Sequence, residues 1–146
     1  MEEEVKHVIR YARLNEDLTI AIFFPTHVIR KKFYSLLAKP AAETGLRLQT
    51  YVSGSDVTRL DFETGGSITL LCDASCKGLE FDAVFIPQLQ RHNIDGVDET
   101  FLKMKLYVMC SRARVHLVLS YTDCDAIPDI VKLFPGEHEG VLEWKI

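Results

Sequence analysis

The chain has 146 residues, of which 47% are hydrophobic and 26% are charged, and it carries a formal net charge of −4 at pH 7. This length and composition predict one globular domain with a single core, spanning residues 1–146. No apolar run reaches the ~20 residues of a membrane span, and the negative charge argues against a free-standing nucleic-acid-binding protein, which normally has a basic surface.

The cysteines and the first residues bear on the compartment. The cysteines at positions 72, 76, 110 and 124 lie mostly inside apolar patterns, and no pair has the C-x-x-C spacing of zinc or redox sites. Met1 is followed by three glutamates rather than by the basic and then apolar stretch of a secretory signal. We therefore expect buried, reduced thiols, no metal site, no membrane partner and a cytoplasmic location.

Residues 2–24 predict a helix followed by a strand. Apolar residues between positions 2 and 15 recur close to the 3.6-residue period, and acidic residues occupy the first turn, where they complement the helix dipole. Thr19–Phe24 is apolar on both alternations, which is typical of a strand covered on both faces in a parallel sheet. This strand is therefore expected at the centre of the sheet.

A second helix and strand are predicted over residues 26–52. Thr26 is the expected N-cap, Pro40 should end or kink the helix, and Gly45 closes the connection. Residues 46–52 then alternate apolar and polar side chains, which predicts a strand with one wetter face, near an edge of the sheet. Residues 53–66 are predicted as loop, with some strand character around residues 57–60.

The stretch from residue 67 to residue 87 is where we expect function. Two apolar runs flank a short loop that holds one glycine, one lysine and two carboxylates, and they are interpreted as adjoining strands with chemistry at their connection. Lys77 and Gly78 lie where a strand is expected to end. Ligands of open α/β sheets bind outside the carboxyl ends of strands, so this loop is a candidate site.

The last third continues the alternation of helix and strand. Asp98 can cap a helix over residues 99–113, whose core stripe would be Leu102, Leu106, Met109 and Ala113. Residues 115–121 predict a strand, residues 125–133 a short helix, and residues 141–146 a weak strand or a tail. Strands that alternate with helices indicate a mainly parallel α/β sheet.

Two blocks in the second half carry a family resemblance. Lys77-Gly-Leu-Glu-Phe-Asp82 and Tyr107–Arg114, YVMCSRAR, resemble motifs V and VI of the second RecA-like domain of UvrD/Rep-type superfamily 1 DNA helicases. Thr19–Thr26 more weakly resembles motif IV. The resemblance implies a RecA-like three-layer α/β/α sandwich, related to P-loop NTPases, in which the large accessory insertion of many relatives is absent.

The resemblance also assigns candidate site residues. It implies that Glu80 contacts the ATP ribose, and a carboxylate does offer two acceptors for sugar hydroxyls. Gly78, after Lys77, would let the backbone approach the nucleotide closely. Phe24 would stack on adenine, and Tyr107 matches the tyrosine of motif VI. No metal ligand is assigned.

Arg112 is the candidate catalytic residue. The sequence pattern places it near the end of the predicted helix, at the border of the core stripe, where its planar guanidinium could pair with phosphate oxygens across an interface. The resemblance makes it the arginine finger of motif VI. Without the resemblance, a surface ion pair or a contact with carbonyls at the helix C-terminus would explain it.

The chain departs from the family pattern at three positions. Pro25 stands where motif IV has an arginine that touches the terminal phosphate, and a proline cannot bind phosphate. Cys72 and Ala74 stand where motif V has threonine and histidine, which help to couple the site to single-stranded DNA. These substitutions weaken the expectation of DNA contact through this segment.

The chain also contains no G-x-x-x-x-G-K-[ST] sequence, and therefore no P-loop of its own. ATP and Mg²⁺ would be bound mainly by a first RecA-like domain of the same helicase, and this fragment alone is predicted to be an inactive monomer. The complete protein would couple ATP hydrolysis to translocation on single-stranded DNA.

Other functions stay open at this stage. The alternative is a degenerate helicase-like α/β domain that acts as a binding or scaffold module without ATPase coupling. A flavodoxin-like receiver would have a similar size, but it needs clustered acids after the first strand, where Pro-Thr-His follows here. The basic residues between the first and second strands are interpreted as a solvated face rather than a DNA track: Arg30, Lys31, Lys32, Lys39 and Arg47.

Overall fold

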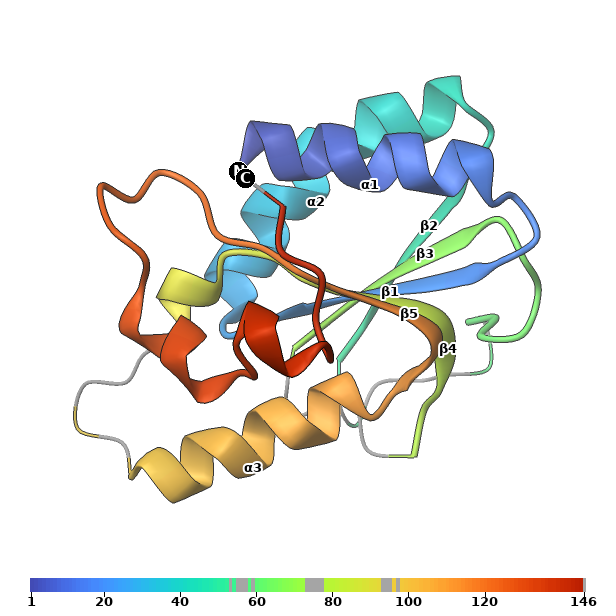
Figure 1. Cartoon of the computed structure of the whole chain (residues 1–146). Coiled ribbons are helices and arrows are strands. Elements are labelled where there is room, and N and C mark those ends of the chain that lie inside the picture. Colours follow the sequence, from blue (N-terminus) through green and yellow to red (C-terminus); the bar gives the residue numbers. More distant parts are fainter. Residues whose placement is uncertain are drawn as a thin grey trace.

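A five-stranded parallel sheet with helices on both faces forms the molecule in this computed structural model, which describes residues 1–52, 54, 58, 60–72, 78–92, 96 and 98–145. Helices α1 (Glu2–Leu14) and α2 (His27–Glu43) cover one face, and α3 (Glu99–Cys110) lies on the other (Figure 1). The predicted α/β/α sandwich with a parallel sheet is therefore confirmed.

Strand β1 (Thr19–Phe24) lies at the centre of the sheet, as its sequence predicts. All six residues are buried, because parallel strands flank β1 on both sides and helices cover both of its faces. Alternate residues enter two separate cores: Ala21 and Phe23 pack toward α3, whereas Ile20 and Ile22 pack toward α1 and α2. A continuous apolar run is what such a position requires.

The two apolar runs of the central stretch do not form neighbouring strands. They are β3 (Ser67–Cys72) and β4 (Phe81–Ile86), and the strand order β2-β3-β1-β4-β5 inserts β1 between them. The expectation that they adjoin is therefore wrong. Both are parallel to β1, so the chain must cross from the carboxyl edge of the sheet back to its amino edge between them.

Helix α2 begins as predicted but does not end at its proline. The backbone N–H of Ile29 donates to the Thr26 hydroxyl at 3.3 Å, which is an N-cap bond, and the helix continues through Pro40 to Glu43. Thr44 caps the end by donating from its hydroxyl to the carbonyls of Pro40 and Ala41. Tertiary packing of the buried Ala41 outweighs the local cost of the proline.

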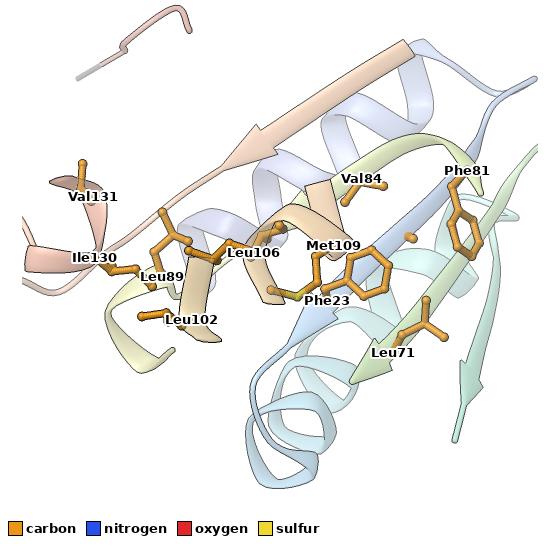
Figure 2. Packing of buried hydrophobic residues seen from close by; sticks show 12 residues of the cluster. Phe23, Leu71, Phe81, Val84, Leu89, Leu102, Leu106, Met109, Ile130 and Val131 are labelled. Carbon is orange, nitrogen blue, oxygen red and sulfur yellow. The ribbon is translucent and has the colours of Figure 1, made fainter. Parts of the chain in front are cut away.

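Helix α3 is shorter than the sequence predicts. Asp98 caps it, and Leu102, Leu106 and Met109 are buried, but the helix ends at Cys110 and Ala113 already belongs to β5 (Ala113–Leu119). Figure 2 shows these helix residues packed with Phe23, Leu71 and Phe81 of the sheet. The early helix end places residues 111 and 112 in a tight turn that leads directly into β5.

The remaining segments are short. Strand β2 (Arg47–Tyr51) is an edge strand, as predicted, and η2 (Leu89–Arg91) follows β4. The helix expected over residues 125–133 is only a 3-10 helix, η3 (Asp129–Leu133), followed by η4 (Glu137–Glu139), and residues 141–145 form no strand. The expected strand character at 57–60 falls mainly outside the described residues. Within the described chain, no helix has the length and apolarity to cross a membrane.

Replacing Pro40 tests the interpretation of α2. Pro40→Ala should raise the free energy of unfolding by about 2 kcal/mol, because a proline inside a helix costs ~3 kcal/mol relative to alanine and recovers part of this by restricting the unfolded chain. Chemical denaturation would measure the change. Lys39→Ala, at the exposed neighbouring position, should change the stability by less than about 0.5 kcal/mol. A less stable Pro40→Ala variant would contradict this view of the helix.

Candidate functional site

The two blocks that resemble helicase motifs meet at the amino edge of the sheet. Gly78–Glu80 leads into β4 and Arg112 leads into β5, and these two strands are paired in parallel from Phe81 and Ala113 onward. The backbone N–H of Phe81 donates to the carbonyl of Arg112 at 2.9 Å. Residues more than thirty positions apart in sequence are therefore held side by side by the sheet.

Arg112 lies in the turn after α3 rather than on the helix itself, which corrects the sequence-based placement. Its Nε donates to the carbonyl of Val108 at 3.1 Å, and its Nη1 donates to the carbonyl of Leu79 at 3.5 Å. The side chain is partly buried. Arg112 thus makes the contact with a carbonyl at the helix C-terminus that was expected if it were not an arginine finger. Its guanidinium is also directed toward the segment before β4.

The backbone around Gly78 is open to solvent. Gly78 has φ +80°, a conformation that residues with side chains rarely adopt, and no described residue beyond its chain neighbours has an atom within 4 Å of the position that a Cβ would take. The side chain of Glu80 is exposed two residues later. Both residues lie at the start of β4, at the amino edge and not at the carboxyl end of a strand, which corrects that expectation. Lys77 lies outside the described residues.

A cluster of polar side chains around Asp82 stabilises the same edge of the sheet. Asp82 Oδ2 accepts from the backbone N–H and the hydroxyl of Thr19 at 2.8 and 2.9 Å, and Oδ1 lies 3.0 Å from Nη2 of Arg114. Burial pushes the pKa of Asp82 upward, but the Thr19 hydrogen bonds and the Arg114 guanidinium outweigh it and hold the pKa below its ordinary value. The cluster ties β1, β4 and β5 together at their amino ends.

The sequence alone does not single out this cluster. Asp82 and Arg114 are only the last residues of the two blocks that resemble helicase motifs. The available signal was a carboxylate inside an apolar strand pattern, Phe81–Ile86, because a half-buried charge in a strand needs a partner. The partner, Thr19, begins β1 and is 63 positions away, so local sequence patterns cannot identify it.

Phe24 does not join the other candidates. It ends β1 at the carboxyl edge, five strand positions from Thr19 and therefore roughly 16 Å from the amino edge. Its side chain is 0% exposed and its ring lies 5.1 Å from the ring of Phe33 in the core. The expectation that Phe24 offers a face for stacking on adenine is not met in this arrangement, because α2 covers the ring.

Tyr107 projects from the outer face of α3. Its side chain is 73% exposed, and it lines a hollow of about 210 Å³ together with Lys103, Leu106, Cys110, Leu133 and Phe134. Tyr107 is one helical turn before the Arg112 turn, since the backbone N–H of Ser111 donates to its carbonyl at 2.9 Å. It therefore neighbours the amino-edge site without being part of the Arg112 contacts.

The described cysteines form no disulfide with one another, and only one of them is buried. Cys72 is buried, Cys110 is half-buried and Cys124 is exposed, so the expectation of buried thiols holds only in part. Burial raises the pKa of Cys110 to about 11. The sulfur of Cys72 lies 3.3 Å from Nδ1 of His27. Among the described residues no group of three or more potential ligands could hold a metal ion.

Three solved structures are similar to this chain to different degrees. The C-terminal domain of a possible DNA helicase from Lactobacillus plantarum WCFS1 is 22% identical, with a TM-score of 0.63 over 90% of this chain and 73% of that chain. The arterivirus nonstructural protein 10 (helicase) has a TM-score of 0.47 at 14% identity over 91% of this chain and 31% of its own. Its complex with DNA has a TM-score of 0.43 at 13% identity, over 85% and 27% of the two chains.

At these identities the likeness concerns the fold, and the first of the three supports a RecA-like α/β domain, as predicted. No protein-family model and no curated protein matches the chain.

Acid titration tests the Asp82 cluster. The folded-state pKa of Asp82 lies below the ~3.9 of an unfolded chain, so its stabilising contribution is complete above that value and is lost as the pH falls through the lower, folded pKa. Asp82→Asn should reduce the free energy of unfolding by about 1–3 kcal/mol at pH 7 and flatten the acid limb of stability against pH. Asp125→Asn, at an exposed position, is the control. Equal acid limbs in the wild type and Asp82→Asn would refute the cluster's role.

Proposed function

We propose that this chain is the C-terminal RecA-like domain of an ATP-dependent DNA helicase. It would supply Lys77, Gly78, Glu80 and Arg112 to an ATP site that a first RecA-like domain, outside this sequence, completes. Tyr107 would border that site. The complete protein would couple ATP hydrolysis to movement along single-stranded DNA.

One observation carries the proposal: the contact between Arg112 and the segment before β4. The motif V and motif VI blocks are separate in sequence, yet the 3.5 Å hydrogen bond to the Leu79 carbonyl and the 2.9 Å backbone bond from Phe81 bring them to one place. A structural arginine alone does not require the exposed carboxylate of Glu80 and the open backbone of Gly78 beside it. The RecA-like fold, shared with a possible helicase domain, supports the same reading.

The geometry of Arg112 suits a side chain that contacts a phosphate group from one side. Two of the five N–H donors of Arg112 are directed at backbone carbonyls, and the others have no acceptor among the described residues, so they would remain for an incoming anion. Arg112 would neutralise charge that develops on the transferred phosphoryl group, an interaction that is stronger in the transition state than in the ground state. Glu80 would accept hydrogen bonds from the ribose, and Gly78 would allow close backbone approach.

Magnesium would come with the nucleotide, held mainly by the first RecA-like domain. The described residues offer no metal cluster, and Gly78, Glu80 and Arg112 suit the sugar and phosphate rather than the cation. When bound, Mg²⁺ would neutralise phosphate charge, and the residues of this chain would orient the nucleotide against it.

Alanine substitution of Arg112 in the complete protein tests the proposal. Arg112→Ala should lower kcat by roughly 10³-fold, as for arginine fingers in other phosphoryl-transfer enzymes, while nucleotide affinity changes much less. The loss of its two carbonyl hydrogen bonds should cost only about 1–2 kcal/mol of stability, so melting curves separate the two effects. Arg112→Lys should recover part of the rate, because it keeps the charge but not the fork.

The fold decides which arginine can serve as the control for Arg112→Ala. Arg114 is unsuitable, because its pairing with Asp82 makes Arg114→Ala a stability variant. Arg10 is exposed on α1, on the opposite face of the sheet from α3, and Arg10→Ala should hydrolyse ATP at the parental rate. If Arg112→Ala hydrolyses ATP at the parental rate, the helicase assignment of this site is wrong.

A scaffold domain without ATPase coupling is the second candidate. The burial of Phe24 and the proline at position 25 favour it, because neither residue can make the nucleotide contacts expected of motif IV. A P-loop elsewhere in the complete protein would support the motor, and its absence would support the scaffold.

The isolated chain should hydrolyse no ATP under either candidate function, because it has no P-loop lysine to cradle phosphates. Steady-state assays with and without single-stranded DNA would measure this. Turnover that stays proportional to protein through a final purification step would contradict both assignments.

A further inference from the structure

A β-bulge lies directly after the Arg112 turn. Phe81 of β4 pairs with Ala113 of β5. The next pair is Ala83 with His116, so one residue of β4 lies opposite two residues of β5. A bulge interrupts the ladder of backbone hydrogen bonds and bends the strand, and bulges next to active sites re-aim side chains. The direction in which the chain leaves the Arg112 turn therefore depends on how this bulge is held.

An ion pair between side chains joins the two strands at the bulge. The single residue on β4 is Asp82, and its Oδ1 lies 3.0 Å from Nη2 of Arg114, one of the two residues opposite. The Asp82 side chain is 21% exposed and the Arg114 side chain is 49% exposed, so water and salt screen the pair only in part. The pair links β4 and β5 at the point where the bulge disrupts their backbone ladder.

Asp82 is itself fixed to the central strand. Its other oxygen accepts from the backbone N–H and the hydroxyl of Thr19, and its own N–H donates to that hydroxyl at 3.0 Å. These three hydrogen bonds leave the carboxylate little freedom to move relative to β1. Among the described residues, Arg114 forms an ion pair with Asp82 alone. The start of β5 is thus anchored through this carboxylate to the centre of the sheet.

The contact between the two motif blocks is sensitive to the register of these strands. Nη1 of Arg112 lies 3.5 Å from the carbonyl of Leu79, which is longer than a usual N–H···O hydrogen bond. The acceptor belongs to the chain that leads into β4, and the donor belongs to the chain that leads into β5. A small slip between the two strands would therefore separate them, whereas the 3.1 Å bond from Nε to Val108, which precedes the turn, would remain.

We propose that Arg114 is a positioning residue for Arg112. By pairing with Asp82 across the bulge, it fixes the register of β5 against β4 and so holds the Arg112 guanidinium beside the Leu79 carbonyl. Arg114 acts through Arg112 and does not itself contact the nucleotide. The inference rests on the proposed function, in which Arg112 meets the transferred phosphoryl group.

Amide hydrogen exchange in the 146-residue chain tests the structural step. The Phe81 N–H donates to the carbonyl of Arg112 at 2.9 Å, so its exchange reports on the pairing of the strands beside the bulge. Arg114→Ala should speed this exchange by roughly tenfold, the effect of weakening about one hydrogen bond. The Ile22 amide, at the centre of β1, reports on global opening and should change much less. If Arg114→Ala does not fold, Arg114→Gln removes the charge and keeps a long side chain.

The matched control is Arg47→Ala. Arg47 begins β2 and pairs with Asp61 at 3.2 Å, and the two side chains are 46% and 36% exposed. The variant therefore removes a comparable ion pair from the opposite edge strand of the sheet. Its Phe81 amide should exchange at the wild-type rate. Equal acceleration of that amide in the two variants, or none in Arg114→Ala, would overturn the positioning role.

Steady-state kinetics of the complete protein test the functional step. Arg114→Ala should lower kcat by roughly 10- to 100-fold with little change in the KM for ATP, because a displacement of ~1 Å near a reacting group costs up to about 10²-fold. Arg114→Lys should recover most of the rate, since it keeps a cation opposite Asp82. In an Arg112→Ala background, Arg114→Ala should lower kcat no further, because the residue through which it acts is gone.

These measurements separate the inference from the proposed function. If Arg112→Ala loses turnover but Arg114→Ala keeps the parental rate, the inference is wrong and the proposed function stands. The same holds if Arg114→Ala lowers kcat by one factor in both backgrounds, because its effect then does not pass through Arg112. If Arg112→Ala keeps the parental rate, the proposed function fails, and the role of Arg114 in catalysis falls with it.

Discussion

Burial of β1 on both faces is the constraint on which the rest of the molecule depends. A strand without exposed residues needs a neighbour on each side and a helix layer on each face, and the chain supplies β3, β4, α1, α2 and α3 for these places. The Asp82 carboxylate then fixes where β1 begins, because it accepts both donors of Thr19.

The two edges of the sheet differ in how their cations are satisfied. At the amino edge, Arg114 pairs with Asp82 and Arg112 donates to backbone carbonyls, so each charge has a protein acceptor. At the carboxyl edge, Arg30 is more deeply buried, and its Nε has no hydrogen-bond partner among the described residues. A buried donor without an acceptor is uncommon in folded proteins, so the two edges differ in how completely their arginines are hydrogen-bonded.

Local sequence patterns predict most of the helices and strands of this fold, but they do not predict the order of the strands in the sheet. The apolar runs and the caps at Thr26 and Asp98 identify strands and helix starts, because each signal is contained in a few neighbouring residues. The insertion of β1 between β3 and β4 is not local, since hydrophobic periodicity is the same for any strand order. The burial of the Phe24 ring could not be predicted for a related reason. The sequence pattern shows that Phe24 is apolar, but only its packing against Phe33 shows that the ring is covered.

The carbonyl contacts of Arg112 bear on its proposed role in a way that motif matching could not reveal. An arginine side chain carries much rotamer entropy, and ordering it on ligand binding weakens the interaction. Hydrogen bonds to Val108 and Leu79 hold the guanidinium in one place before any anion arrives, so less entropy is lost in binding. Because Leu79 also lies between Gly78 and Glu80, a shift of that loop would move the arginine with it. The hydrogen bonds of Arg112 to these carbonyls are therefore compatible with its proposed contact with a phosphate. The hydrogen bonds would position the guanidinium for that contact.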